Sequence, residues 1–342
     1  MEFTFDLNTI WFMLIGVLLT GYAILDGFDL GVGMLHLFVK GDENRRILIN
    51  SIGPVWDGNE VWLITGGGAL FAAFPHVYAT VFSGFYTALI LLLFALIFRA
   101  IALEFRSKQP MKWWRKAWDT AFSVSSLLIA LLMGVALGNI ITGVPIDSNK
   151  EFAGSFFGLL NPYALLVGIM TVSLFIMHGT IYAAMKTEGE LQKKILGWID
   201  NLFFIFIVLY IVVSVATVLF YPHMLDNFQN TPALFVVVLL NILAIVNIRR
   251  ELNRKKEFAA FISSCVNIAA LMTIFAIGIF PNIVLSNPNP ENSLTIYSAA
   301  SSQKTLEIML IIACIGMPFV IAYTTIIYWV FRGKVKIDQT SY

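Results

Sequence analysis

Four carboxylic acids interrupt two apolar stretches near the start of the chain, in two pairs whose members are three residues apart. Asp26 and Asp29 lie in LDGFDLGVGML, and Asp57 and Glu60 lie in WDGNEVW. An ionised carboxylate in hydrocarbon costs at least ~2.5 kcal/mol, so such a residue usually faces a charged partner, water or a proton route. The pattern predicts a polar site inside a membrane protein, with proton transfer as its chemistry.

The composition indicates that most of the chain lies in a membrane. Apolar residues make up 58% of the 342 residues and charged residues 13%, whereas soluble proteins average about 25% charged residues. Cys265 and Cys314 both fall in apolar stretches, where cysteine acts as a small hydrophobic residue, so we expect no metal site on this chain. The net charge of +1 gives no steering field, and nothing in the sequence indicates a nucleic-acid surface.

Nine apolar runs set the expected fold. Each is long enough to cross a hydrocarbon core of about 30 Å, and backbone groups in lipid must be satisfied within the segment, which favours helices. We therefore predict an all-α, polytopic membrane helix bundle that forms a single transmembrane domain over residues 1–342. The nine predicted spans are 10–39, 51–74, 79–102, 118–141, 161–185, 201–221, 232–248, 258–280 and 304–331.

The positive charges of the connections predict the orientation. Lys and Arg gather in every second connection, such as 106–116 and 249–256, and the connections between them carry almost none. Cytoplasmic loops of membrane proteins carry this excess of Lys and Arg. The alternation predicts a multi-pass plasma-membrane protein with its N-terminus outside and its C-terminus in the cytoplasm.

This topology brings the intramembrane charges to similar depths. At 1.5 Å per residue, Asp29, Asp57 and Arg99 are all expected within roughly 15 Å of the cytoplasmic surface. Residues three apart share one side of a helix, so Asp26 joins Asp29, and Glu60 joins Asp57. Arg99 is the predicted counter-charge for these acids. Carboxyl groups crowded at low dielectric generally have a raised pKa, a property of proton carriers.

Other interpretations of the same residues stay open. The acids could be hydrated near the surface and serve assembly only, in which case the chain is a structural scaffold. His178 could be a haem ligand or a proton relay, although a lone membrane histidine more often forms a hydrogen bond between helices. A proton-coupled secondary transporter would also use buried acids, but the inverted repeats and broken helices of such transporters are not visible here.

Long segments of the sequence closely resemble subunit II of the cytochrome bd-type quinol oxidases. The segments are GYAILDGFDLGVGML, RRILINSIGPVWDGNEVWLITGGGALFAAFP and FSGFYTALILLLFALIFRAIALEFRSK. Further resemblance appears in GVALGN, NPYALLVG and SLTIYSAASSQKTL. The resemblance is strongest over residues 20–110, and over about 186–280 it is one of hydropathy alone.

The resemblance implies a function for the complex. Such oxidases oxidise quinol, reduce dioxygen to water and support the proton gradient with protons taken from the cytoplasm. Haem b and haem d are then expected on subunit I, and this chain would be its partner, inactive alone. Haem iron needs axial ligands at membrane depth, and few histidines are available here. The other expected partners are a small single-helix subunit, lipid, quinol, and a quinone bound to this chain.

The resemblance also implies roles for individual residues. Asp57 matches the aspartate of the family's WDGN motif, which is associated with a cytoplasmic proton path, and Asp29 and Arg99 match neighbouring polar positions. Asp26 is then a supporting acid. The resemblance gives no role to Glu60, because some relatives have glutamine at its position; we expect Glu60 to act as a relay from its place beside Asp57 in the sequence.

Overall fold

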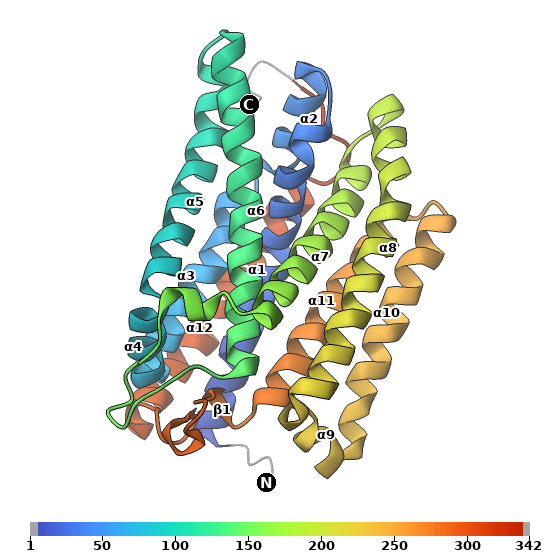
Figure 1. The fold of residues 1–342 in the computed structure, drawn as a ribbon. Helices are drawn as coiled ribbons and strands as arrows, with labels where there is room; N and C mark the ends of the chain where they lie inside the picture. Colours follow the sequence, from blue (N-terminus) through green and yellow to red (C-terminus); the bar gives the residue numbers. More distant parts are fainter. Residues whose placement is uncertain (1–5, 338–342) are drawn as a thin grey trace.

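The chain folds into a bundle of long helices that run roughly side by side (Figure 1). This computed structural model describes residues 6–337, so residues 1–5 and 338–342 of the predicted domain lie outside the described residues. The N-terminal end of α1 and the C-terminal end of α12 lie at opposite ends of the bundle (Figure 1). The predicted all-α membrane bundle is confirmed.

The elements keep the order of the predicted spans, with additional short helices between them. The helices are α1 (Leu7–Leu35), α2 (Asp42–Ile52), α3 (Trp56–Ala73), α4 (Pro75–Gly84), α5 (Tyr86–Phe105), α6 (Lys112–Thr142), α7 (Pro162–Lys186), α8 (Gly189–Phe220), α9 (Asp226–Asn230), α10 (Phe235–Asn253), α11 (Glu257–Ile279) and α12 (Gln303–Val330), and the strands are β1 (Asn282–Val284) and β2 (Leu294–Thr295).

Eight helices in the described part of the chain are long and apolar enough to cross a membrane. The predicted span 51–74 is not among them. Its first two residues belong to α2, a turn at 53–55 containing Gly53 and Pro54 separates them from α3, and Asp57 and Glu60 lower the hydropathy of α3. A ninth crossing by α3, and the orientation of the bundle, stay predictions.

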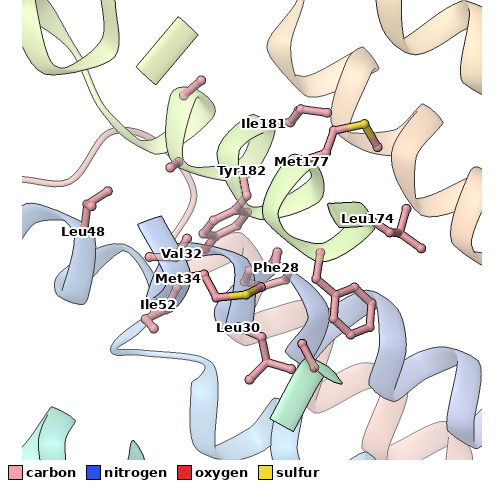
Figure 2. Close-up of a cluster of buried hydrophobic side chains, with 14 of the residues drawn as sticks. Phe28, Leu30, Val32, Met34, Leu48, Ile52, Leu174, Met177, Ile181 and Tyr182 are labelled. Carbon is pink, nitrogen blue, oxygen red and sulfur yellow. The ribbon is translucent and has the colours of Figure 1, made fainter. Parts of the chain in front are cut away.

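Helix α1 runs through the middle of the bundle and packs against α3, α6, α7 and α11. Phe28 of α1 stacks on Tyr182 of α7 with ring centroids 3.9 Å apart, and Figure 2 shows both rings between the two helices. The Tyr182 hydroxyl donates a hydrogen bond to the carbonyl of Ser51, 2.8 Å away, which ties α7 to α2. The acids of α1 therefore lie on a segment of the helix, residues 26–35, that is buried throughout.

The close crossing of α1 and α7 depends on glycine. A Cβ placed on Gly31 would lie 2.0 Å from the carbonyl oxygen of Phe175 and 2.7 Å from the Cα of Gly179. The spacing of Gly27 and Gly31 predicts such close packing between helices, and the structure confirms it. Of the three glycines at 66–68, only Gly66 has a close neighbour in this way.

A second apolar cluster closes the end of the bundle that holds the start of α1. It includes Trp11, Phe74, Val144 and Leu294, all at most 4% exposed. Strands β1 and β2 pair antiparallel at this end, close to the start of α1 (Figure 1). The indole nitrogen of Trp11 donates to the carbonyl of Leu306, 2.9 Å away, and so fixes the start of α12.

Candidate proton-transfer site

An arginine and an aspartate from two helices form the centre of the site. Arg99 of α5 and Asp26 of α1 are both fully buried. Nη1 of Arg99 donates to Oδ2 of Asp26 over 2.8 Å, and Nη2 donates to Oδ1. Such bidentate pairs fix the geometry of both side chains and are among the stronger hydrogen-bonded contacts in proteins.

Asp29 lies one helical turn further along α1 and is also fully buried. Its Oδ2 is 3.9 Å from Nη2 of Arg99 and accepts a hydrogen bond from Nδ2 of Asn59 over 2.8 Å. Its Oδ1 has no hydrogen-bond partner among the described residues. One cation therefore stands between two buried acids, and it is committed mainly to Asp26.

Two further residues connect Asp29 to the C-terminal helix. Asn59 of α3 is buried, and its Nδ2 also donates to the carbonyl of Leu25 over 3.2 Å. Its Oδ1 accepts a hydrogen bond from the hydroxyl of Tyr328 on α12 over 2.8 Å. Neither residue is among the predicted site residues. Asn59 stands in the quoted WDGN motif, whereas Tyr328 is 269 residues away and carries no local signal.

The second pair of acids lies on α3 and is divided between two environments. Glu60 is half-buried and interacts electrostatically with Arg99, Asp26 and Asp57. Asp57 is exposed, and no hydrogen-bond or ion-pair partner for it occurs within residues 6–337. The structure thus brings Asp26, Asp29 and Arg99 together, whereas Glu60 forms no ion pair or hydrogen bond with them within residues 6–337 and Asp57 lies apart.

The surroundings of Asp57 on α3 are apolar and exposed. Val61, Ile64 and Phe71 are 49%, 70% and 59% exposed, respectively. Together with Asp57 they follow positions i, i+4, i+7 and i+14, so they share one face of the helix. A carboxylate on a face of this kind would be costly against lipid, which favours a protein or water environment for this face.

The polar layer ends abruptly toward the N-terminal end of α1. The hydroxyl of Tyr22, one turn before Asp26, is buried and interacts with the Asp26 carboxyl. Beyond it, the buried residues of α1 include Leu18, Ile15 and Trp11. Between the start of the helix at Leu7 and Tyr22, α1 contains no acidic or basic residue.

The two histidines within membrane helices do not fit a haem site on this chain. The ring nitrogens of His178 contact the hydroxyl of Ser264 at 2.8 Å and the carbonyl of Ile24 at 3.0 Å, as the interhelical interpretation predicted. Nε2 of His36 contacts Oδ1 of Asp119 at 2.5 Å. The described residues also contain no group of three His, Cys, Asp or Glu side chains that could hold a metal ion.

The comparisons with known proteins identify the family. The family model for cytochrome bd terminal oxidase subunit II matches residues 7–331. The chain belongs to this family. It is 38% identical to the cytochrome bd-I ubiquinol oxidase subunit 2 of Escherichia coli K12, over 96% of this chain and 95% of that protein.

Other members of the subunit II family and one solved structure agree. The cytochrome bd ubiquinol oxidase subunit 2 of Bacillus subtilis is 35% identical, over 97% of both chains. The structure of bd oxidase from Geobacillus thermodenitrificans has the same fold, with a TM-score of 0.78 at 17% identity, over 95% of this chain and 98% of that chain.

Family membership settles the broad class of this protein. A subunit II is part of a bd oxidase complex and implies a partner, subunit I. The eight apolar helices and the bacterial relatives make the chain a multi-pass protein of a bacterial plasma membrane. The alternative of a proton-coupled transporter is not favoured by these findings.

Proposed function

We propose that this subunit provides a cytoplasmic proton path to an oxidase complex that oxidises quinol and reduces dioxygen to water. In this proposal haem b and haem d are held by subunit I, and no residue of this chain touches the reacting atoms. The hydrogen bonds already made by His178 and His36 support that division. The chain alone is then inactive, and it stabilises the haem-bearing subunit.

The observation that carries the proposal is the shortage of positive charge around Asp26 and Asp29. Arg99 and Asp26 form a pair that is neutral as a whole. An ionised Asp29 beside this pair would be a buried charge without full compensation, and such charges cost several kcal/mol. Asp29 is therefore the acid best placed to take up and release a proton, and Asp26 stays bound to Arg99.

Asp57 and Glu60 are proposed to deliver protons to Asp29, which we call the proton store. Asp57 is exposed at the start of α3, and the half-buried Glu60 interacts electrostatically with both Asp57 and Arg99. We assign proton uptake to Asp57 and the relay to Glu60. Because the exposed face of α3 is otherwise apolar, subunit I is expected to cover it and to enclose water beside Asp57.

Asn59 and Tyr328 are uncharged and position the carboxyl group of Asp29. Asn59 donates to Asp29 and accepts from Tyr328, so it fixes the carboxyl of Asp29 by one oxygen and leaves the other available. A water molecule or a hydroxyl from subunit I could then meet Oδ1. This arrangement gives Asp29 a defined direction for proton release.

The apolar end of α1 supports access from one side. Leu18, Ile15 and Trp11 are buried and follow Tyr22 toward the N-terminal end of the helix. A proton on Asp29 has no titratable side chain to reach among these buried residues. The predicted orientation puts the open side toward the cytoplasm. A single-helix subunit and a quinone bound by this chain remain predictions from the sequence.

The test is the replacement of Asp57 by Asn in the assembled complex, with Asp57→Glu as the conservative variant. A missing proton-transfer group typically costs 10²–10⁴ in rate, so oxygen consumption should fall at least about tenfold in Asp57→Asn and recover in Asp57→Glu. The control is Glu190→Gln, which removes a carboxylate that is 90% exposed at the start of α8. Unchanged haem absorption bands would report intact assembly. An assembled Asp57→Asn complex with normal oxygen consumption and charge translocation would remove the assignment.

A further inference from the structure

Helices α5 and α6 are joined by a hairpin, residues 105–118, that carries three exposed lysines. Lys108, Lys112 and Lys116 are all exposed, and none forms an ion pair within residues 6–337. Lys112 and Lys116 are four residues apart at the start of α6, so they share one side of the helix. Three positive charges are thus free to meet a partner.

Aromatic side chains accompany these lysines. Trp113 is 64% exposed, and its ring packs edge-on against Trp114 with centroids 5.7 Å apart. Trp114 in turn packs against Trp118 with centroids 5.6 Å apart. Phe105, which is 48% exposed, lies beside Trp118. Tryptophan with basic residues at a helix end is typical of the membrane–water interface.

The arginines of the hairpin are already committed to acids, which makes its base rigid. Arg106 is buried, and its Nε donates to Asp119 over 2.5 Å and its Nη2 to Asp42 over 2.8 Å. Nη1 of Arg115 donates to the other oxygen of Asp42 over 2.9 Å. The lysines therefore carry the positive charges of the hairpin that are free to bind a partner. The ion pairs of the two arginines hold the hairpin in place.

The length of α6 places the hairpin at the membrane surface. Its 31 residues span ~46 Å at 1.5 Å per residue, which exceeds a hydrocarbon core of ~30 Å. The start of α6 extends further than the neighbouring helices at this end of the bundle (Figure 1). The lysines and Trp113 therefore project to the height of lipid headgroups.

We propose that the hairpin 105–118 binds the headgroups of anionic phospholipids in the leaflet that it faces. Each basic residue near an anionic membrane surface contributes roughly 1 kcal/mol, and three lysines beside interfacial tryptophans meet the requirements for such a site. A protein partner fits less well, because protein interfaces are depleted in lysine and enriched in arginine. Here the arginines are engaged within the chain and the lysines are outside.

The experiment compares lipid retention by the assembled complex in nanodiscs that contain phosphatidylglycerol and phosphatidylcholine. Mass spectrometry of the detergent-extracted complex counts the lipids of each class that remain bound. The unmodified complex should retain phosphatidylglycerol in preference to phosphatidylcholine. The triple variant Lys108→Gln, Lys112→Gln, Lys116→Gln should lower this preference by at least about tenfold.

A matched control removes the same charge elsewhere. Lys255, Lys256 and Lys336 are exposed and lie outside the hairpin, so their replacement by Gln should leave the preference for phosphatidylglycerol unchanged. Inorganic phosphate at millimolar concentration should not displace the lipid, since a docked headgroup is held together with its apolar chains.

Three results would overturn the proposal. The unmodified complex could show no preference for phosphatidylglycerol, or the control variant could lose the preference as strongly as the hairpin variant. The third is cross-linking of Lys108, Lys112 or Lys116 to subunit I in the assembled complex with a short lysine-reactive reagent. That result would assign the hairpin to a protein interface.

Discussion

Arg99 holds the carboxylate of Asp26 through both of its terminal nitrogens and joins α5 to α1 at a point where neither side chain meets solvent. The nearest oxygen of Asp29 is 3.9 Å from the same guanidinium. Two acids of one helix therefore differ in environment, although only three residues separate them. We therefore propose that the first acid stabilises the fold and that the second exchanges protons.

Replacing the two aspartates should separate stability from turnover. Asp26→Asn leaves Arg99 buried without its partner, and breaking a buried ion pair typically costs about 3–5 kcal/mol. We expect a poorly assembled complex with a lower melting temperature. Asp29→Asn keeps an oxygen to accept from Asn59, so the complex should assemble while oxygen consumption falls. Haem content, thermal stability and oxygen consumption measure the difference. Equal losses of stability in both variants would contradict the division of roles.

Arg99→Lys tests the geometry of the pair. Lysine keeps the positive charge but cannot donate two parallel hydrogen bonds to one carboxylate. Thermal stability of the complex should fall, by less than in Arg99→Leu, where the charge is removed as well. If the Arg99→Lys complex had the same thermal stability as the unmodified complex, the bidentate contact to Asp26 would not contribute to stability.

Tyr328→Phe removes one hydroxyl and keeps the aromatic ring. A hydrogen bond of this kind contributes about 1 kcal/mol, so the complex should assemble normally. Oxygen consumption should fall a fewfold, because Asn59 is then free to turn away from Asp29. The control is Tyr323→Phe, since Tyr323 is 64% exposed on the same helix. A normal rate of oxygen consumption in Tyr328→Phe would show that the hydrogen bond from Tyr328 to Asn59 is not needed for turnover.

Gly31→Ala tests the crossing of α1 and α7. The added Cβ would meet backbone atoms of α7 at 2.0–2.8 Å, and overpacking of this kind costs about 1–3 kcal/mol. Thermal stability and haem content of the complex should fall together. Gly16→Ala is the matched control on the same helix, because no atom lies within 4 Å of its added Cβ. Comparable losses in both variants would contradict the packing argument.

The sequence predicts the helices well, because these depend on hydropathy and on the rise per residue of a helix. It also indicates Arg99 as a counter-charge for the acids without defining which acid it meets, and in the structure that acid is Asp26. The break at Gly53 and Pro54 also has a signal in the sequence that the apolar pattern concealed. Proline cannot complete the hydrogen bonds of a helix interior. The expected span therefore merged the end of α2 with α3.

Contacts between distant segments could not be predicted in the same way. Tyr328 meets Asn59 only because α12 packs beside α1 and α3, and no local pattern encodes that arrangement. The predicted layer of four acids depends on depth and on the three-residue spacing within each pair. Depth does not define which side of α3 faces α1, and in the structure Asn59 takes the inner position while Asp57 is exposed.

The most direct measurement is infrared difference spectroscopy of the assembled complex between its oxidised and reduced states. If Asp29 exchanges a proton, a band of a protonated carboxyl group should change during the transition. That band should be absent in Asp29→Asn and present in Glu190→Gln. An identical band in the Asp29→Asn complex, at full haem content, would contradict the assignment of Asp29 as the proton store.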